Sequence, residues 1–334
     1  MPTLRNFLEK ININAAIAYE EPMSAHTTFR IGGPAEAFVS PRDREACLRL
    51  LREARAAGLP LFALGGGANI LVGDRGIRGI VLDTSLLSAI RVEEGDPDAG
   101  AGPCPEAGPE AGRDGLQGGS LLVAEAGASV DALCETALER GLAGLENFYG
   151  MPGSLGGAVF MNARCYEVEM ADRLAWVEAA SPEAGANVER RPRSAGEWAY
   201  KRSPYQAGGP AAGALVLAAA FRLRPGERAE IEATMRGRRA DREAKGHYRL
   251  PSAGSVFKND RALGRPTGKI LDELGFRGRR IGDAAVSDWH ANIFVNAGKA
   301  SAADMRALIE CAQREVRERL GVGIEAEVVF AGDF

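Results

Sequence analysis

The sequence has few cysteines, and no two of them stand close together. The 334 residues include five, at Cys47, Cys104, Cys134, Cys165 and Cys311, and no CxxC pair. Zinc knuckles and disulfide frameworks need closely spaced or regularly paired cysteines, so neither is expected, and we expect free thiols in a reducing compartment. The three histidines, His26, His247 and His290, have no spacing that indicates a metal site. We therefore predict no bound metal.

The chain also lacks a surplus of basic residues and any long apolar run. Its 41 basic and 45 acidic side chains give a formal charge of −4, which indicates no nucleic-acid partner. No stretch reaches the roughly 20 apolar residues that cross a bilayer, and residues 1–5 do not begin a signal peptide. Because 46% of the residues are hydrophobic and 26% charged, we expect a globular protein that is cytoplasmic and not inserted in a membrane.

Glycine is abundant, at 42 residues, whereas aromatic residues make up only 6%. Two glycine-rich stretches, at 65–67 and 153–157, each lie next to an apolar run that we interpret as a strand. Glycine lets successive backbone N–H groups converge on phosphate oxygens, so the two stretches could cradle a dinucleotide, but each could also be a tight hairpin turn. Neither fits a GxGxxG turn that opens a helix, and no GxxxxGK(S/T) motif exists. The interpretation that remains is a β-rich domain of a non-Rossmann type that binds a flavin or another nucleotide.

Helical and strand-like patterns follow one another along the chain without an internal repeat. Apolar spacing predicts a short helix and then a connection within 1–20, and helices at 42–57, 130–141, 228–245 and 302–320. Strands are predicted from residue 28, at 61–64, 70–72, 80–82, 121–125, 158–161 and 326–331, with antiparallel strands over 174–224. The Pro, Gly, Ala and Glu of residues 97–119 predict an exposed, flexible insertion, and a composition change near Pro225 predicts a domain boundary.

Single polar residues give weaker signals. Ser255 follows a glycine but is not part of GxSxG, so a structural role in a turn is the default. Glu325 and Glu327 share one face of the last predicted strand and would ordinarily be solvated. The YKRS run at 200–203 fits an anion clamp or an exposed basic turn equally well. Residue patterns alone thus indicate a nucleotide-binding α+β protein.

Five stretches are far more specific together than singly. They read HTTFRIGG at 26–33, LGGGANIL at 64–71, GMPGSLGGAVFMN at 150–162 followed by Tyr166, PSAGSVFKN at 251–259, and EAEV at 325–328. This ordered series, which spans about residues 20–332, resembles the UDP-N-acetylenolpyruvoylglucosamine reductase (MurB) family of peptidoglycan precursor synthesis.

The resemblance implies an α+β fold of two parts. Residues 1–225 would form an FAD-binding module of the vanillyl-alcohol-oxidase (PCMH) type, with subdomains at about 20–85 and 86–225, and residues 226–334 a C-terminal α+β substrate-binding domain. It implies non-covalent FAD, NADPH as co-substrate, and reduction of the enolpyruvyl ether of UDP-N-acetylglucosamine to the lactyl ether; we expect a monomer. Two alternatives stay open: another flavin oxidoreductase on this module, such as an oxidase of small alcohols, and a flavin- or nucleotide-binding protein without turnover.

The resemblance also implies roles for individual residues. The flavin would be lined by Gly65, Gly66, Gly67, Ala68, Asn69, Gly153, Ser154 and Gly157. Ser255 would be the general acid, and Glu327 rather than Glu325 the catalytic carboxylate. The residues near the substrate would be Tyr166, Lys245, Asn259 and His290.

The chain departs from the family at the basic run. The family usually has Tyr-Arg-x-Ser where this chain has Tyr200-Lys201-Arg202-Ser203, so the usual arginine falls on Lys201. Lysine supplies the charge without the bidentate fork of arginine. Either Lys201 takes the catalytic role or Arg202 does so with a shifted backbone; we favour Lys201 as catalytic and assign Arg202 to substrate binding. A second departure is Arg164-Cys165, where the family commonly has small residues.

Overall fold

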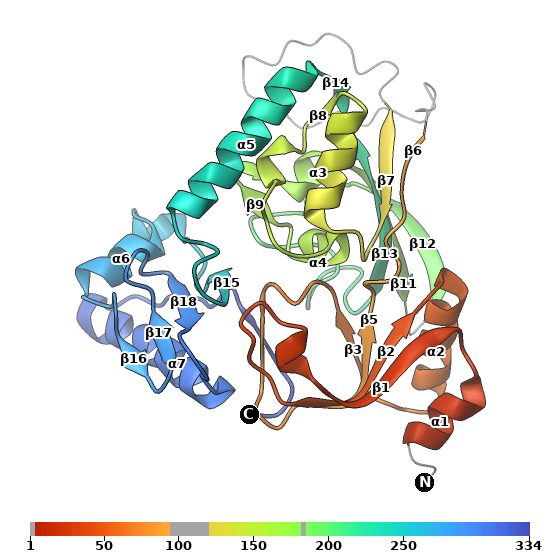
Figure 1. The fold of residues 1–334 in the computed structure, drawn as a ribbon, viewed down its shortest axis with the longest axis horizontal. Coiled ribbons are helices and arrows are strands. Elements are labelled where there is room, and N and C mark those ends of the chain that lie inside the picture. Colours follow the sequence, from red (N-terminus) through yellow and green to blue (C-terminus); the bar gives the residue numbers. More distant parts are fainter. Residues whose placement is uncertain (1–3, 94–119, 182–184) are drawn as a thin grey trace.

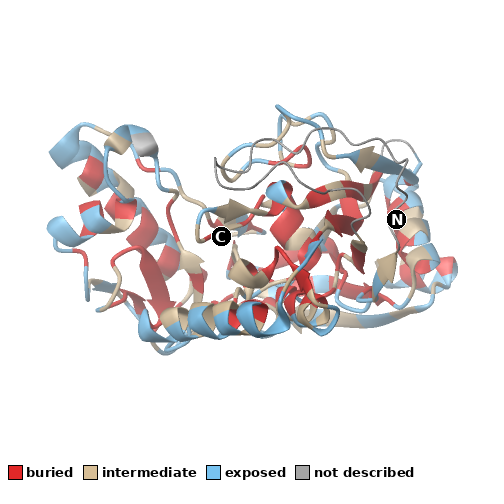
Figure 2. Cartoon of the chain, turned by 90° about the horizontal axis from the view of Figure 1, so that it is seen from above, coloured by how far each residue is buried: buried red, intermediate tan, exposed pale blue. Residues whose placement is uncertain are grey.

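The computed structural model of the protein describes residues 4–93, 120–181 and 185–334 (Figure 1). The insertion predicted at 97–119 lies outside these ranges. Within them the chain forms an N-terminal part built on two sheets and a smaller C-terminal lobe (blue in Figure 1). Buried residues fill the interior of both parts (Figure 2). No helix of the described ranges is long and apolar enough to cross a membrane.

The first sheet has the strand order β1-β2-β5-β3. Its strands are β1 (Ala15–Pro22), β2 (Pro34–Pro41), β5 (Ile77–Asp83) and β3 (Leu61–Leu64). Strands β1 and β2 pair antiparallel, whereas β2, β5 and β3 run parallel. Helices α1 (Leu4–Ile11) and α2 (Arg44–Ala56) cover it, burying Leu8 and Leu50 in a shared apolar cluster. Asp43 caps α2 by accepting a 2.8 Å hydrogen bond from the Ala46 N–H, so the helix begins there.

The second sheet is antiparallel throughout, in the order β12-β11-β13-β7-β6. Its strands are β12 (Asn187–Pro192), β11 (Leu174–Ser181), β13 (Leu215–Arg222), β7 (Leu121–Glu125) and β6 (Ile90–Glu93). The antiparallel strands expected over 174–224 are thus confirmed. Helices α3 (Val130–Glu139), α4 (Leu155–Phe160) and α5 (Arg228–Ala244) contribute buried residues to its core.

Helix α5 is predicted from the sequence to open the C-terminal domain. It buries Ile231 and Met235 in the core of the second sheet, and it runs from that sheet toward the C-terminal lobe (Figure 1). The division of the chain at residue 225 stays a prediction.

The C-terminal lobe has a four-stranded sheet in the order β15-β18-β17-β16. Its strands are β15 (Ser252–Ser255), β18 (Ile293–Asn296), β17 (Ala284–Val286) and β16 (Arg280–Ile281), and its helices are α6 (Thr267–Glu273) and α7 (Ala302–Leu320). Ser301 and Asp304 form a capping box at the start of α7. Gly321, at a φ of +68°, ends that helix in the left-handed region that glycine adopts most easily.

The two parts share backbone pairing and apolar core. Strand β19 (Val329–Ala331) pairs in parallel with β4 (Ile70–Val72), which follows the first glycine stretch. Phe29, Ile31 and Leu71 are buried in the apolar cluster of the C-terminal lobe. The remaining short elements are β8 (Leu142–Ala143), β9 (Arg164–Cys165), β10 (Val168–Glu169), β14 (Arg224–Pro225), η1 (Met23–Ala25), η2 (Glu146–Phe148), η3 (Met170–Asp172) and η4 (Arg261–Leu263).

Several local predictions are wrong. The apolar run at 158–161, expected as a strand, is mostly helical: residues 158–160 belong to α4, which ends before Met161. Leu155 and Val159 stabilise this helix because they are buried in the core of the second sheet. Residues 15–22, expected as a connection, form β1, which pairs with β2 and is stabilised by that pairing. The strand expected from residue 28 begins at Pro34, because Arg30 and Gly32 take positive φ values. The last strand begins at Val329 rather than 326, and Ala326 forms only an isolated bridge to Phe257.

Candidate functional site

A large cavity of about 1440 Å³ lies where the two glycine stretches meet the C-terminal lobe. Most of the residues expected at the site line it: Gly65, Gly66, Gly67, Ala68, Asn69, Gly153, Ser154, Gly157, Tyr166, Lys201, Lys245, Ser255, Asn259 and Glu327. The fold therefore brings together side chains from the two sheets and from the last third of the sequence. Arg202 and His290 are absent from the lining described here.

The two glycine stretches touch each other at one end of this cavity. The Gly66 N–H donates a 3.1 Å hydrogen bond to Ser154 Oγ. A Cβ on Gly66 would lie 2.6 Å from Gly153 Cα, and one on Gly67 would lie 1.9 Å from the His26 carbonyl oxygen. Gly67 also has a φ of +60°. Glycine is needed here because the two loops pack backbone against backbone.

The residues of this cradle fit a dinucleotide such as FAD. Thr28 lines the cavity beside the first glycine stretch, and its backbone N–H donates to the Gly67 carbonyl at 3.0 Å. Its hydroxyl Oγ1 is buried and has no hydrogen-bond partner among the described residues. Buried polar atoms are nearly always paired, so an unpaired hydroxyl beside a glycine-lined wall suits a cofactor rich in polar atoms.

The Gly66→Ala variant should bind less FAD and be less stable. The new methyl group would force the loops apart, an overpacking that typically costs about 1–3 kcal/mol. Gly237→Ala is the control, because a Cβ on Gly237 within α5 meets no atom within 4 Å apart from the nearby backbone of the same helix. That change should raise the free energy of unfolding by about 1 kcal/mol. Both variants are measured by flavin absorbance per protein and by denaturant unfolding. Full flavin content in Gly66→Ala would contradict the prediction that the glycine-lined wall binds FAD.

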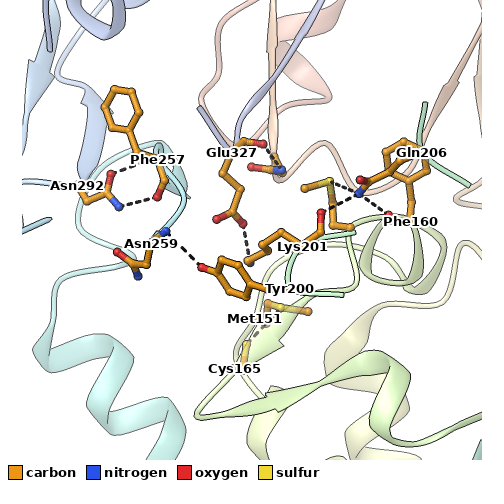
Figure 3. A network of polar contacts seen from close by, with 12 residues as sticks. Met151, Phe160, Cys165, Tyr200, Lys201, Gln206, Phe257, Asn259, Asn292 and Glu327 are labelled. Atoms are coloured by element: carbon orange, nitrogen blue, oxygen red, sulfur yellow. Dashed lines mark hydrogen bonds and ion pairs between the residues drawn. The ribbon is translucent and has the colours of Figure 1, made fainter. Parts of the chain in front are cut away.

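Lys201 and Glu327 form an ion pair within the cavity (Figure 3). Lys201 Nζ lies 2.6 Å from Glu327 Oε1, and each side chain is 13% exposed. Lys201 has a φ of +57°, a conformation that non-glycine residues seldom adopt and that marks functional sites. The turn is closed by Ala199 and Arg202, which exchange backbone hydrogen bonds of 3.2 and 2.9 Å. Lys201 therefore reaches Glu327 from a turn that two backbone hydrogen bonds close.

The backbone of Glu327 joins the first glycine stretch to the strand of Ser255. Asn69 Nδ2 donates to the Glu327 carbonyl at 3.0 Å, and the Glu327 N–H donates to the Val256 carbonyl at 2.7 Å. Ser255 ends β15 and also lines the cavity. Glu325 instead pairs with Lys258 and is 74% exposed. Of the two glutamates, Glu325 and Glu327, only Glu327 therefore lines the cavity.

Tyr166 belongs to a second polar cluster on the cavity wall. Its hydroxyl donates to Asp241 Oδ2 at 2.6 Å, and Lys245 Nζ lies 2.7 Å from the same oxygen. Burial raises the pKa of Tyr166 to about 12, and the hydrogen bond to Asp241 adds to the effect. The guanidinium groups of Arg238 and Arg242 lie 4.1 and 5.6 Å from its ring centroid. The phenol stays neutral and the surroundings are cationic, which suits an anionic ligand.

Asn259 lies between the two parts of the molecule. Its backbone N–H donates to the Tyr200 hydroxyl at 3.4 Å (Figure 3). Its side-chain Oδ1 accepts a 2.9 Å hydrogen bond from the Thr267 N–H at the start of α6. Asn259 therefore ties the Lys201 turn to the C-terminal lobe.

Two expected residues take other places. Arg202 is exposed beside the Lys201 turn. His290 lines a smaller cavity of about 270 Å³, which shares Ser255 and Asn259 with the large one. Its Nδ1 accepts a 3.2 Å hydrogen bond from the Asn292 N–H. The geometry thus favours Lys201 over Arg202 for contact with a ligand in the large cavity.

His247 lines the large cavity and gives the fold a pH dependence. Burial lowers its pKa to about 4, with Arg242, His290 and Lys245 adding to the effect and Asp241 opposing it. The unfolded histidine takes up its proton near pH 6.5, so the unfolded state binds more protons between pH 6.5 and 4. The free energy of unfolding should therefore fall as the pH decreases through this window.

The His247→Asn variant should lose this part of the pH dependence. Denaturant unfolding at intervals from pH 7 to 4 would measure wild type against variant, and the advantage of the wild type should shrink as the pH falls. His290, whose pKa burial also lowers, is present in both proteins. A difference that stays constant over the window would contradict the buried neutral imidazole.

Thr28, Asp241 and Arg242 are polar residues of the cavity lining that the sequence did not single out. The HTTFRIGG stretch, which contains Thr28, is the sequence signal that indicates this residue. Asp241 on α5 stands four residues before Lys245, the C-cap residue of that helix, a spacing that brings the two side chains together. Arg242 donates from Nη2 to Cys165 Sγ at 3.0 Å, and no sequence signal indicated that contact.

Fold and cavity together define a class of protein. The chain is an FAD-binding α+β module of the vanillyl-alcohol-oxidase type in two subdomains, followed by a smaller C-terminal α+β domain. A family model described as an FAD binding domain matches residues 35–186. A second, described as the C-terminal domain of UDP-N-acetylenolpyruvoylglucosamine reductase, matches residues 246–331. The expected fold class is confirmed.

Whole-length relatives identify the family. The chain is 38% identical to the UDP-N-acetylenolpyruvoylglucosamine reductase of Treponema denticola, covering 95% of this chain and 94% of that protein. It is 39% identical to the reductase of the same name from Agathobacter rectalis, covering 94% of each. The solved structure of the Thermus caldophilus reductase (MurB) is 29% identical, with a TM-score of 0.70 over 95% of this chain and 98% of that one. The chain belongs to the UDP-N-acetylenolpyruvoylglucosamine reductase (MurB) family.

Proposed function

We propose that the protein is a UDP-N-acetylmuramate dehydrogenase, which reduces the enolpyruvyl ether of UDP-N-acetylglucosamine to the lactyl ether with NADPH. The observation that carries the proposal is the meeting of Ser255, Lys201 and Glu327 on the cavity that both glycine stretches line. Relatives over nearly the whole chain bear the name of this reductase. This activity would be a step of peptidoglycan precursor synthesis in the cytoplasm. Through it the protein would contribute to cell-wall biogenesis, cell shape and cell division.

FAD would be held by the backbones of Gly65, Gly66, Gly67, Gly153 and Gly157, with Ala68, Asn69 and Ser154 completing the wall. Bound there, it supplies a two-electron carrier between NADPH and the substrate double bond. Reduction adds a hydride to one carbon of that double bond and a proton to the other, so NADPH becomes NADP⁺ and the enolpyruvyl ether becomes the lactyl ether.

Ser255 supplies the proton from its hydroxyl. Serine is a weak acid, but the accepting carbon is strongly basic when negative charge develops on it, so position matters more than acidity. The Lys201 ammonium faces the negative charge that builds on the substrate carboxylate and the adjoining carbons. A preorganised cation at such a place stabilises the transition state more than the ground state, and Glu327 fixes the ammonium at 2.6 Å.

The remaining cavity residues bind the rest of the substrate. Tyr166 and Lys245, joined through Asp241, offer a hydroxyl from the turn between β9 and β10 and a cation from the C-terminal end of α5. Asn259 offers its side chain from the C-terminal lobe. The diphosphate of the substrate would bind to the cationic side chains of this wall.

An anaerobic stopped-flow trace of flavin absorbance tests the proposal. NADPH alone should bleach the flavin, and the UDP-sugar enolpyruvyl ether should then restore its absorbance. An oxidase of small alcohols would be bleached by an alcohol and reoxidised by oxygen, and a binding protein without turnover would respond to neither. Either of those results would overturn the proposal.

A further inference from the structure

Asn292, which directly precedes β18, holds the strand that carries Ser255. It is 1% exposed. Its Oδ1 accepts a 2.9 Å hydrogen bond from the Phe257 N–H, and its Nδ2 donates to the Phe257 carbonyl at 2.8 Å (Figure 3). Its own carbonyl accepts a third bond, of 2.9 Å, from the Val256 N–H. One asparagine thus bonds both residues that follow Ser255.

These bonds continue the pairing of β15 with β18 beyond its irregular end. Ser252 pairs with Val295 and Ser255 with Ile293, with a register shift between them. The asparagine amide presents a donor and an acceptor side by side, as a peptide group does. It therefore replaces a strand partner for Phe257, where the backbone pairing of β18 has ended.

The segment of Glu327 occupies the other edge of the same residues. The Glu327 N–H donates to the Val256 carbonyl at 2.7 Å, and Ala326 forms a bridge with Phe257. Val256 and Phe257 are consequently held between Asn292 on one side and residues 326–327 on the other. The position of Ser255 relative to Glu327 depends on this short three-segment ladder.

We propose that Asn292 is a positioning residue for the reduction, which acts by fixing the spacing between the Ser255 hydroxyl and the Lys201–Glu327 pair. The inference rests on the proposed function. Without the amide, Phe257 loses two hydrogen bonds on one edge, and the end of β15 is free to move away from Glu327. A displacement of about 1 Å in a reacting group can lower a rate about 10²-fold.

Asn296 provides a matched control at the other end of β18. It is also buried, at 5% exposed. Its Oδ1 accepts from the Gly298 and Ala300 N–H groups at 3.1 and 3.0 Å, and its Nδ2 donates to the Phe29 carbonyl at 3.2 Å. Asn296 thus shares the residue type and burial of Asn292, and both amide atoms of its side chain bond backbone groups, with a further 3.5 Å bond from Nδ2 to the Arg30 carbonyl. None of these side-chain bonds reaches residues 255–257 or 326–327.

The test compares Asn292→Ala with Asn296→Ala in the two half-reactions of the FAD-loaded protein. Both variants should lower Tm, because each leaves buried backbone groups unpaired. Flavin reduction by NADPH should stay near the wild-type rate in both. Flavin reoxidation by the enolpyruvyl ether should slow about 10²-fold in Asn292→Ala and stay near wild type in Asn296→Ala.

A double-variant cycle shows whether the effect passes through Ser255. Once Ser255→Ala has removed the hydroxyl, adding Asn292→Ala should slow reoxidation little further, because coupled residues are not additive. Full additivity, or equal slowing by the two asparagine variants, would overturn the inference while leaving the proposed function intact. A wild-type flavin that the substrate does not reoxidise would overturn both. If Asn292→Ala does not fold, Asn292→Asp, which keeps the acceptor for Phe257, is measured against the same outcomes.

Discussion

Replacing Ser255 with alanine should leave FAD reduction by NADPH near the wild-type rate and slow flavin reoxidation by the substrate about 10²- to 10⁴-fold, the usual contribution of a general acid. The hydroxyl is needed only where a carbon must be protonated, and NADPH oxidation protonates none. The side chain lines the cavity at the end of β15. Stopped-flow absorbance separates the two steps.

Ser252→Ala is the control for this prediction. Ser252 begins the same strand and lines the same cavity, so loss of a hydroxyl there tests general disturbance of β15. Both half-reactions should keep their rates in this variant. Equal slowing of both half-reactions in Ser255→Ala, with flavin content intact, would mean that Ser255 is not the proton donor.

Removal of the charge at Lys201 should have the second large effect. Lys201→Met keeps the length and apolar stem of the side chain but removes the ammonium, and loss of one such electrostatic group costs about 10²- to 10³-fold in the step that it assists. Reoxidation by substrate should slow by that factor. Lys201→Arg, which restores the residue usual in the family, should keep much of the rate.

Arg202→Ala is the matched control, because it removes the neighbouring charge. Arg202 is exposed, whereas Lys201 is 13% exposed and paired with Glu327. The Arg202 variant should reoxidise with substrate near the wild-type rate. Loss of that step on removing only Arg202 would assign the catalytic cation to Arg202 instead.

The ordered motifs predicted the fold class and the residues of the cavity more fully than local patterns predicted the elements. Helix α4 was missed because Gly156 and Gly157 lower its intrinsic helix propensity, and only the burial of Leu155 and Val159 against the second sheet stabilises it. Strand β1 was missed because Ala15–Pro22 has little apolar alternation and depends on its pairing with β2. Both are cases in which tertiary contacts decide the structure.

The sequence left the choice between Lys201 and Arg202 open for a physical reason. Adjacent residues differ in direction according to the backbone angles between them, and the positive φ of Lys201 is set by the closed turn from Ala199 to Arg202. No residue type in that turn indicates a left-handed backbone conformation at Lys201. Asn292 was missed similarly, because a single asparagine before an apolar run says nothing of the strand that it bonds.

The pairing of β19 with β4 limits how ligands can enter and leave. Swinging the C-terminal lobe away as a rigid body would break the parallel ladder at Val329–Ala331 and withdraw Phe29, Ile31 and Leu71 from its apolar core. Separate lobes joined by a small polar interface move easily, whereas lobes that share a core do not. We therefore expect NADPH and the sugar nucleotide to enter and leave through shifts of side chains and surface loops. The N-terminal part and the C-terminal lobe should stay docked throughout turnover.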